Sequence, residues 1–297
     1  MAGMEDQLNI GVVFPQTEIG PDPSAVRAYA EAVEGAGFSH VLAYDHVLGA
    51  GLENRSEWRG AYSNDDAFHE VFVLFGYLAA ITTRIELVTG VLVLPQRQTA
   101  LVAKQAAEID VLSGGRLRLG VGVGWNAVEY EALAEPFSTR GRRIEEQVDV
   151  MRKLWTESIV DYSGTYHRIP EAGINPLPIQ QPIPVWMGGY VEATMRRIGR
   201  MADGWFPRGM PDAALQRDID IIAESAADAG RDPGSIGMEG RISLHPGDEA
   251  RWEADTAAWR SAGATHLAIN TMGQGRSPAQ HIEAVLRYAE VIGLTAG

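Results

Sequence analysis

The chain of 297 residues contains no cysteine, and this absence removes several kinds of chemistry at once. Disulfide bonds, thiol nucleophiles, iron–sulfur clusters and cysteine-ligated zinc are all excluded. Lysine is nearly absent as well, since Lys104 and Lys153 are the only two. The net charge of −14 opposes binding to nucleic acids and to anionic membranes. We therefore expect a small-molecule substrate as partner, with no nucleic acid and no membrane.

Motifs that mark metal sites, serine hydrolases and membrane segments are also missing. There is no H-x-H or H-E-x-x-H spacing, and no G-x-S-x-G turn that would expose a nucleophilic serine. No apolar run reaches the roughly 18 residues of a membrane span. Residues 1–7 lack the basic and apolar regions of a secretory signal. We expect a cytoplasmic protein without a bound metal ion.

Short apolar stretches alternate with amphipathic segments along the whole chain, a pattern typical of parallel strands joined by helices. The length and the unbroken rhythm predict a single α/β domain over residues 1–297, a (β/α)8 TIM barrel with insertion loops at the C-terminal face of the strands. The alternative is a doubly wound sheet, which would usually leave a second domain to explain. The predicted strands are Leu8–Pro15, His40–His46, Ile85–Leu94, Leu117–Gly124, Pro184–Gly188, Gly204–Pro207, Ile236–Leu244 and His266–Thr271.

An internal similarity supports the barrel. Residues 36–43 and 262–269 share one pattern, in which a helix end and a glycine precede a hydroxyl residue, a histidine and an apolar strand. This pattern places His40 and His266 on the face opposite the active site, where we expect structural roles. Two segments interrupt the rhythm, 48–65 and 158–182, and the second contains a hairpin-like stretch at 160–168. Both follow strand ends, where long loops often act as lids over a site, although simple surface decoration is equally compatible with the sequence.

The most informative segment runs from Glu86 to Asn126. It contains a strand with Thr89-Gly90-Val91, a helix, a turn at 113–116, and a strand whose alternating glycines end before Trp125-Asn126. Residues 122–127 formally match the G-x-G-x-x-A dinucleotide fingerprint. We discount that match because Phe137 and Ser138 intervene before the next clear helix and no suitably placed acid follows for a ribose. Glycines can also let a flat ligand approach strand ends, or simply permit tight packing.

This strand–helix–glycine-strand block resembles the luciferase-like family of flavin and deazaflavin oxidoreductases, and the resemblance extends over most of the chain. It implies an oxidoreductase that transfers a hydride between the deazaflavin coenzyme F420 and a small organic substrate. The alternative within the family is an FMN-dependent monooxygenase that uses reduced flavin and O2. A separate reductase or dehydrogenase would reduce the cofactor, and we expect a homodimer. The rival from another class is a barrel that binds a flavin or other ligand without catalysis.

The resemblance also assigns the site. It implies that His46 is the catalytic acid–base, and a histidine is chemically suited to that role because its ordinary pKa lies near neutrality. In this family a non-prolyl cis peptide presses against the cofactor ring, and the matching bond here is Gly90-Val91. The later glycine pair, 188–189, would hold the cofactor's phosphate before a helix N-terminus. The cofactor-binding residues are Asp45, Gly90, Val91, Leu92, Gly122, Gly124, Asn126, Met187, Gly188, Gly189 and Tyr190, and the substrate pocket comprises Gln16, Trp58, Tyr62 and Trp125.

One departure from the family narrows the substrate. The F420-dependent sugar-phosphate dehydrogenases have a glutamate after the last glycine of the fourth strand, where this chain has Trp125. A carboxylate proton donor at that position is therefore absent, and sugar phosphates are not the expected substrates. The tryptophans and Tyr62 favour an apolar or aromatic organic molecule.

Overall fold

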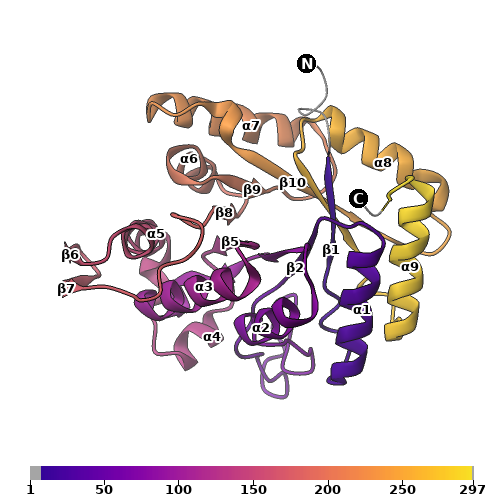
Figure 1. The fold of residues 1–297 in the computed structure, drawn as a ribbon, viewed down its shortest axis with the longest axis horizontal. Helices are drawn as coiled ribbons and strands as arrows, with labels where there is room; N and C mark the ends of the chain where they lie inside the picture. The colour runs from indigo at the N-terminus through magenta and orange to yellow at the C-terminus, as the bar shows by residue number, and fades with distance from the viewer. Residues whose placement is uncertain (1–7, 296–297) are drawn as a thin grey trace.

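The protein is described by a computed structural model that covers residues 8–295. Eight parallel strand positions form a closed barrel, because β3 pairs with β5 as well as with β2 and so completes the ring (Figure 1). The predicted (β/α)8 TIM barrel is thus confirmed. Its strands are β1 (Asn9–Val13), β2 (His40–Ala43), β3 (Glu86–Thr89), β4 (Leu92–Val93), β5 (Leu117–Gly122), β8 (Val185–Gly188), β9 (Gly204–Phe206), β10 (Gly237–Ser243) and β11 (His266–Asn270).

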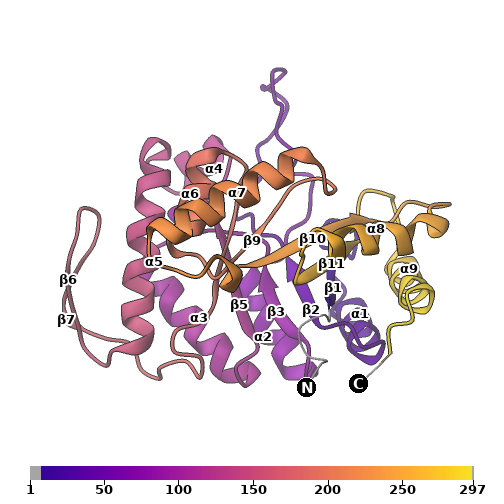
Figure 2. The same ribbon diagram turned by 90° about the horizontal axis from the view of Figure 1, so that it is seen from above.

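Helices surround this barrel on the outside (Figures 1 and 2). The boundaries follow local signals: α1 begins where the Asp22 side chain accepts from the Ser24 amide, and α9 begins with a Ser277–Gln280 capping box. None of the helices in residues 8–295 is both long and apolar enough to cross a bilayer. The helices are α1 (Pro23–Gly35), α2 (Val71–Ile81), α3 (Thr99–Ser113), α4 (Ala127–Ala132), α5 (Arg140–Thr156), α6 (Glu192–Met201), α7 (Ala213–Asp228), α8 (Glu249–Ser261) and α9 (Pro278–Val291).

The third barrel strand differs from the sequence prediction. The segment 85–94 is not one strand but two, β3 and β4, and the peptide bond Gly90–Val91 between them is cis, as the family resemblance predicts. β4 continues the pairing with β5, with Leu92 opposite Val121, before a 3-10 turn at Leu94–Gln96. The barrel wall therefore has a bulge at the end of its third strand.

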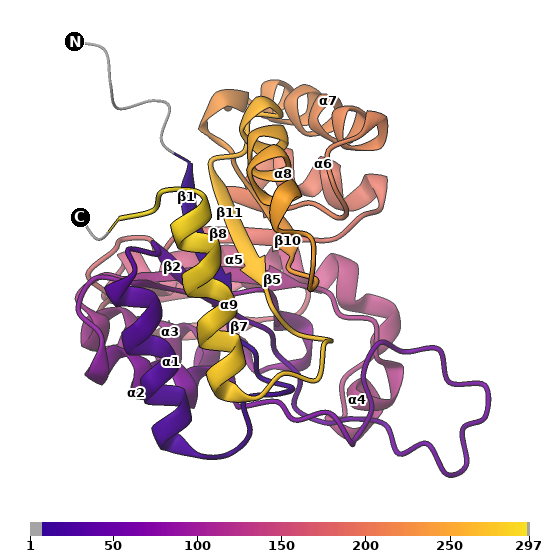
Figure 3. The same cartoon turned by 90° about the vertical axis from the view of Figure 1, so that its right-hand side faces the viewer.

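Both interrupting segments lie outside the barrel. The residues between β2 and α2 form a long irregular loop that projects beyond α4 (Figure 3). The second segment contains the predicted hairpin, with β6 (Val160–Ser163) antiparallel to β7 (Arg168–Ala172), and it extends past α5 (Figure 2). Glu146 holds the hairpin tip by accepting from the backbone amides of residues 165–167 and by contacting His167 Nδ1 at 2.8 Å.

The N-terminal end of the barrel is closed by a buried charged cluster. Glu239 of β10 contacts His40 Nε2 at 3.1 Å and pairs with Arg118 of β5, whose guanidinium lies 4.3 Å from the ring centroid of Trp186. His266 packs edge-on against both His40 and Trp186. These residues fill the barrel end, which agrees with the structural role predicted for both histidines.

Candidate active site

A cavity of about 640 Å³ opens at the C-terminal ends of the strands, where barrel enzymes place their active sites. Its size is in the range of ordinary ligand pockets. The cavity is lined by residues that follow β1, β2, β5 and β11, by the end of β10, and by the bulge between β3 and β4. Seven predicted site residues line it: Asp45, His46, Tyr62, Gly90, Val91, Gly124 and Trp125.

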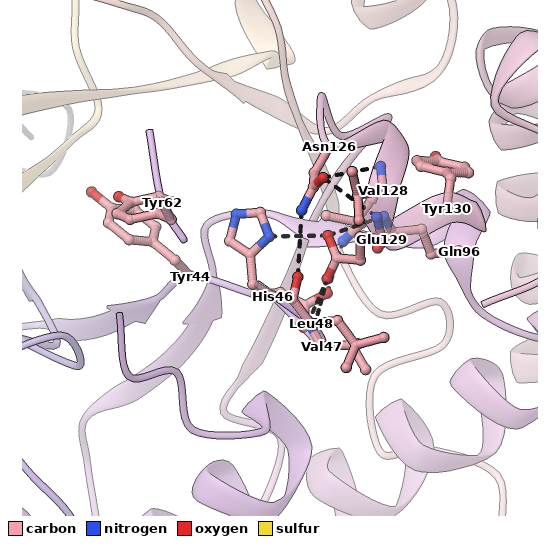
Figure 4. A network of polar contacts seen from close by, with 12 residues as sticks. Tyr44, His46, Val47, Leu48, Tyr62, Gln96, Asn126, Val128, Glu129 and Tyr130 are labelled. Atoms are coloured by element: carbon pink, nitrogen blue, oxygen red, sulfur yellow. Dashed lines mark hydrogen bonds and ion pairs between the residues drawn. The ribbon is translucent and has the colours of Figure 1, made fainter. Parts of the chain in front are cut away.

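His46 lies at the edge of this cavity, held by one carboxylate and three aromatic rings. Its Nδ1 is 3.1 Å from Oε2 of Glu129, while Nε2 makes no hydrogen bond to any residue in 8–295 (Figure 4). Its ring centroid is 4.9 Å from that of Phe68, 5.5 Å from Tyr62 and 5.6 Å from Trp125. The histidine is thus fixed on one side and open on the other.

Glu129, which sequence reasoning missed, is the residue that orients His46. It is fully buried on α4 and also accepts from the amides of Val47 and Leu48 and from Gln96 Nε2 (Figure 4). Burial by itself raises the pKa of a carboxyl, but the His46 hydrogen bond and the two amides outweigh it, so the pKa of Glu129 lies below its ordinary value. Glu129 is therefore an ionised acceptor at neutral pH.

The helix that carries Glu129 corrects one expectation. We expected no helix directly after the glycine strand, yet α4 begins at Ala127, capped by the Asn126 side chain. The signal was present in the sequence, since Asn126 is followed by Glu129 at the spacing typical of a helix N-terminus. Asn126 itself acts as this cap and donates to the Leu48 carbonyl; it lines a smaller neighbouring cavity of about 270 Å³ rather than the main one.

Asp45 lines the cavity, but its carboxylate points at the protein. Oδ2 accepts from the Val93 amide at 3.0 Å and Oδ1 pairs with Arg97 at 2.7 Å. Arg97 in turn reaches Glu70 at the start of α2. Asp45 therefore anchors β4, the segment that follows the cis peptide, and so holds the bulge against the cavity.

The glycines of β5 and β8 make room for this bulge. A Cβ at Gly122 or at Gly188 would collide with the Val91 side chain, and one at Gly124 would collide with Val93. Tight packing against Val91 and Val93 is thus the physical reason for these glycines. Leu92 and Met187 are buried in the barrel core beside them. Of the three glycines, Leu92 and Met187, only Gly124 lines the cavity. Contact of the other four residues with a cofactor stays a prediction.

The predicted phosphate site, Gly188 to Tyr190, lies at the end of β8, outside the residues that line the main cavity. The first turn of α6 has no side-chain cap. The Thr194 amide donates to the Val191 carbonyl at 2.7 Å, which leaves the amides of residues 192 and 193 without a partner in residues 8–295 and able to face a ligand. Arg208 lies over the exposed Tyr190 ring, 4.3 Å from its centroid. The Arg208 guanidinium therefore provides a positive charge next to Tyr190, shortly before α6 begins.

Two predicted substrate residues do not line the main cavity. Gln16 is fully buried, and its side-chain amide exchanges two hydrogen bonds with the Tyr44 backbone, which ties the end of β1 to the end of β2. Trp58 lies on the outer side of Trp125, with ring centroids 5.7 Å apart and Gly60 between them. Direct substrate contact by either residue stays a prediction.

Several polar residues of the cavity were not predicted from the sequence, namely Thr17, Glu18, Tyr44, Asp66, Arg241, Ser243 and Asn270. Arg241 donates to the Tyr44 hydroxyl at 2.7 Å. Burial raises the pKa of Tyr62 to about 12, so its hydroxyl stays protonated at neutral pH. Within residues 8–295, no group of three or more metal-ligating side chains is arranged to hold a metal ion.

Comparison with known proteins identifies the family. The family model described as luciferase-like monooxygenase matches residues 9–292. An uncharacterised protein of Mycobacterium tuberculosis is 36% identical over 223 residues, 73% of this chain and 77% of the relative. An F420-dependent glucose-6-phosphate dehydrogenase of Segniliparus rotundus is 32% identical and covers 76% of this chain and 66% of the relative. An FMNH2-dependent dimethylsulfone monooxygenase of Pseudomonas putida is 29% identical and covers 68% of this chain and 53% of the relative.

Solved structures agree on the fold. The F420-dependent tetrahydromethanopterin reductase of Methanopyrus kandleri superposes with a TM-score of 0.76 at 16% identity, over 96% of this chain and 98% of that one. A long-chain alkane monooxygenase superposes with a TM-score of 0.80 at 14% identity, over 98% and 93%. These similarities include F420-dependent and FMN-dependent proteins alike. The chain belongs to the luciferase-like monooxygenase family.

Proposed function

We propose that this chain is an F420-dependent oxidoreductase that transfers a hydride between the coenzyme and a small organic substrate, with His46 exchanging the proton at the substrate. The observation that carries the proposal is the arrangement of His46: Nδ1 is held by a buried carboxylate, and Nε2, at the edge of the cavity, has no hydrogen-bond partner among residues 8–295. The free nitrogen can exchange a proton with a group that enters the cavity.

The residues present fit a deazaflavin. The bulge at Gly90 and Val91 gives the cavity one wall of backbone and a single aliphatic side chain, which suits the face of a planar ring. Asp45 and Arg97 hold that wall in place from behind. The uncapped start of α6 and Arg208 would bind the phosphate of the coenzyme. When bound, the coenzyme supplies the hydride chemistry, and the protein supplies position and proton transfer.

The chain's own groups have distinct tasks in this proposal. His46 Nε2 accepts a proton from a substrate hydroxyl when hydride leaves the substrate, and returns it in the reverse direction. Tyr62 and Trp125 pack against the His46 ring and shield it from water. A separate enzyme would reduce or reoxidise the coenzyme between turnovers.

The second candidate is an FMN-dependent monooxygenase, favoured by the relative from Pseudomonas putida. The F420-dependent relative has the higher identity, 32% against 29%, and covers more of this chain, and the proposal follows that order. In the FMN reading, His46 would instead serve as a proton donor to a reduced-oxygen species.

Titration of the purified protein with F420 and with FMN, followed by tryptophan fluorescence, separates the two readings. Trp125 lines the cavity and reports occupancy directly. We expect F420 to bind at least about tenfold more tightly, a difference of about 1.4 kcal/mol. Equal or reversed affinities would move the protein to the monooxygenase reading, and no binding of either would remove both.

A further inference from the structure

Three groups besides His46 donate hydrogen bonds to the Glu129 carboxylate. Oε1 accepts from the backbone amides of Val47 and Leu48, and Oε2 accepts from the side-chain amide of Gln96 at 3.1 Å. Neither a backbone N–H nor an amide NH2 can accept a proton in return. The fourth contact, His46 Nδ1 at 3.1 Å from Oε2, lies in this same set of donors.

From this geometry we infer that Glu129 is a positioning residue that fixes neutral His46 as the Nδ1–H tautomer, so that its Nε2 presents a lone pair at the cavity. The catalytic role inferred for this tautomer rests on the proposed function, whereas the tautomer itself does not. An ionised, fully buried carboxylate accepts only N–H donors, so Nδ1 must carry the proton. The neutral ring then has a single acceptor site, Nε2, on the side away from Glu129 (Figure 4).

In this tautomer, His46 is oriented to accept a proton from a group in the cavity. The lone pair on Nε2 can take the proton of a substrate O–H while the C–H hydride leaves for the coenzyme, and the imidazolium that forms faces the Glu129 carboxylate. In the serine-protease triad, a carboxylate in the same relation orients a histidine, and its replacement by the amide lowers kcat about 10⁴-fold through the wrong tautomer.

The structure also predicts what the amide would do here. In Glu129→Gln the side-chain oxygen keeps the two backbone amides, because they sit on one side of the carboxylate. The new NH2 group takes the place of Oε2 and donates to His46 Nδ1. Gln96 can no longer donate at this position, but its Oε1, which has no partner within residues 8–295, can accept from the same NH2 group once the Gln96 amide turns over. The neutral ring must then carry its proton on Nε2, and the acceptor at the cavity is lost.

Long-range ¹H–¹⁵N NMR of histidine rings tests this directly, because it distinguishes the two neutral tautomers. The protein is measured without coenzyme at a pH where His46 is neutral, and the His46 signals are assigned by their loss in His46→Gln. We expect the Nδ1–H form to exceed the Nε2–H form at least about tenfold in the wild-type protein, and the ratio to invert in Glu129→Gln. A wild-type His46 in the Nε2–H form overturns the inference, whether or not the variant folds.

A second pair in the chain provides the matched control. Glu146 contacts His167 Nδ1 at 2.8 Å and accepts three backbone amides, yet it lies on α5 at the hairpin and away from the main cavity. Glu146→Gln should leave the His46 signals unchanged and turnover within about twofold.

Turnover gives the catalytic readout. In Glu129→Gln we expect kcat to fall at least about tenfold while KM and F420 affinity stay within about twofold. A fall in coenzyme affinity equal to the fall in kcat would make Glu129 a structural residue and overturn the positioning role. Absence of any F420-dependent turnover in the wild-type protein would refute the proposed function instead, and the NMR result would still decide the tautomer.

Discussion

The two ends of the barrel each contain a buried glutamate paired with a histidine at 3.1 Å, and they use the pair differently. At the N-terminal end, His40 Nε2 contacts Glu239 and His40 Nδ1 contacts the Ser39 hydroxyl, so both ring nitrogens are occupied. At the C-terminal end, His46 contacts Glu129 through Nδ1, and its Nε2 has no partner in the described part of the chain. One pair closes the barrel, and the other leaves a nitrogen beside a cavity. The two pairs therefore differ in the contacts of the second ring nitrogen and not in the carboxylate.

The charged groups around the two pairs also differ. Burial raises the pKa of Glu239, but the Arg118 guanidinium and His40 outweigh it and lower that pKa to about 2. Burial, with Arg118 nearby, lowers the pKa of His266 to about 3. At neutral pH, His266 is therefore neutral and Glu239 is ionised beside the Arg118 cation. Glu129, in contrast, has no arginine partner among the residues that contact it.

The largest effect should come from breaking the N-terminal pair. Glu239→Gln leaves the buried Arg118 with only Glu86, at 2.9 Å, as its carboxylate partner. Loss of one member of a buried ion pair costs about 3–5 kcal/mol, and we expect the lower end because Glu86 remains. Urea unfolding followed by circular dichroism measures the change. A loss below about 1 kcal/mol would show that the cluster is not needed for folding.

Lowering the pH should weaken the same cluster, and with it the stability of the fold, without a mutation. Both pKa values lie below those of the unfolded chain, so the unfolded state binds more protons and stability falls as the pH is lowered. The His266 contribution is complete above pH 6.5 and is lost toward about pH 3; that of Glu239 is complete above pH 4.5 and is lost toward about pH 2. Urea unfolding between pH 7 and 4 checks this. Stability that stays constant over that interval contradicts it.

At the C-terminal end the effect should be on turnover. His46→Gln keeps a polar side chain among the three aromatic rings but removes the proton-exchanging nitrogen. We expect turnover to fall about 100-fold, as on loss of a general acid–base, with F420 affinity within about twofold. His167→Gln, on the hairpin, is the control and should keep full activity. Unchanged turnover in His46→Gln would reduce His46 to a packing residue like His40.

The smallest expected effect is on F420 affinity, through the site proposed for the phosphate of the coenzyme. Arg208 is exposed and stacks on Tyr190, so its removal should not destabilise the barrel. Arg208→Gln should weaken F420 binding about fivefold to tenfold through loss of one charge-assisted contact. Fluorescence titration at low and high salt measures this, since the wild-type advantage should shrink as salt screens the charge. Wild-type affinity in the variant would place the phosphate elsewhere.

The barrel and the position of His46 could be predicted because both depend on local patterns. Alternating apolar strands and helices, and the place of His46 after the second strand, are visible in the chain itself. The cis bond at Gly90–Val91 followed from the resemblance and is present. Glu129 could not be recognised in this way, because its meaning depends on a contact 83 residues away in the sequence.

The glycines show a second limit of prediction from the sequence. Gly122 and Gly188 are conspicuous in the sequence and suggest space for a ligand, but the space at both is taken by Val91. Arg118 and Glu239, 121 residues apart, are likewise unremarkable in the chain and meet only because β5 and β10 close one barrel. Long-range packing decides which polar residues become buried partners, and no local spacing encodes it.

The most direct test is histidine NMR during titration with F420, since it compares the two ends of the barrel in one experiment. The account predicts that the His46 ring signals shift on addition of F420 while those of His40 do not, and that FMN at the same concentration causes a smaller change. Binding of F420 that leaves the His46 signals unmoved would contradict the central claim that this histidine faces the coenzyme and its substrate.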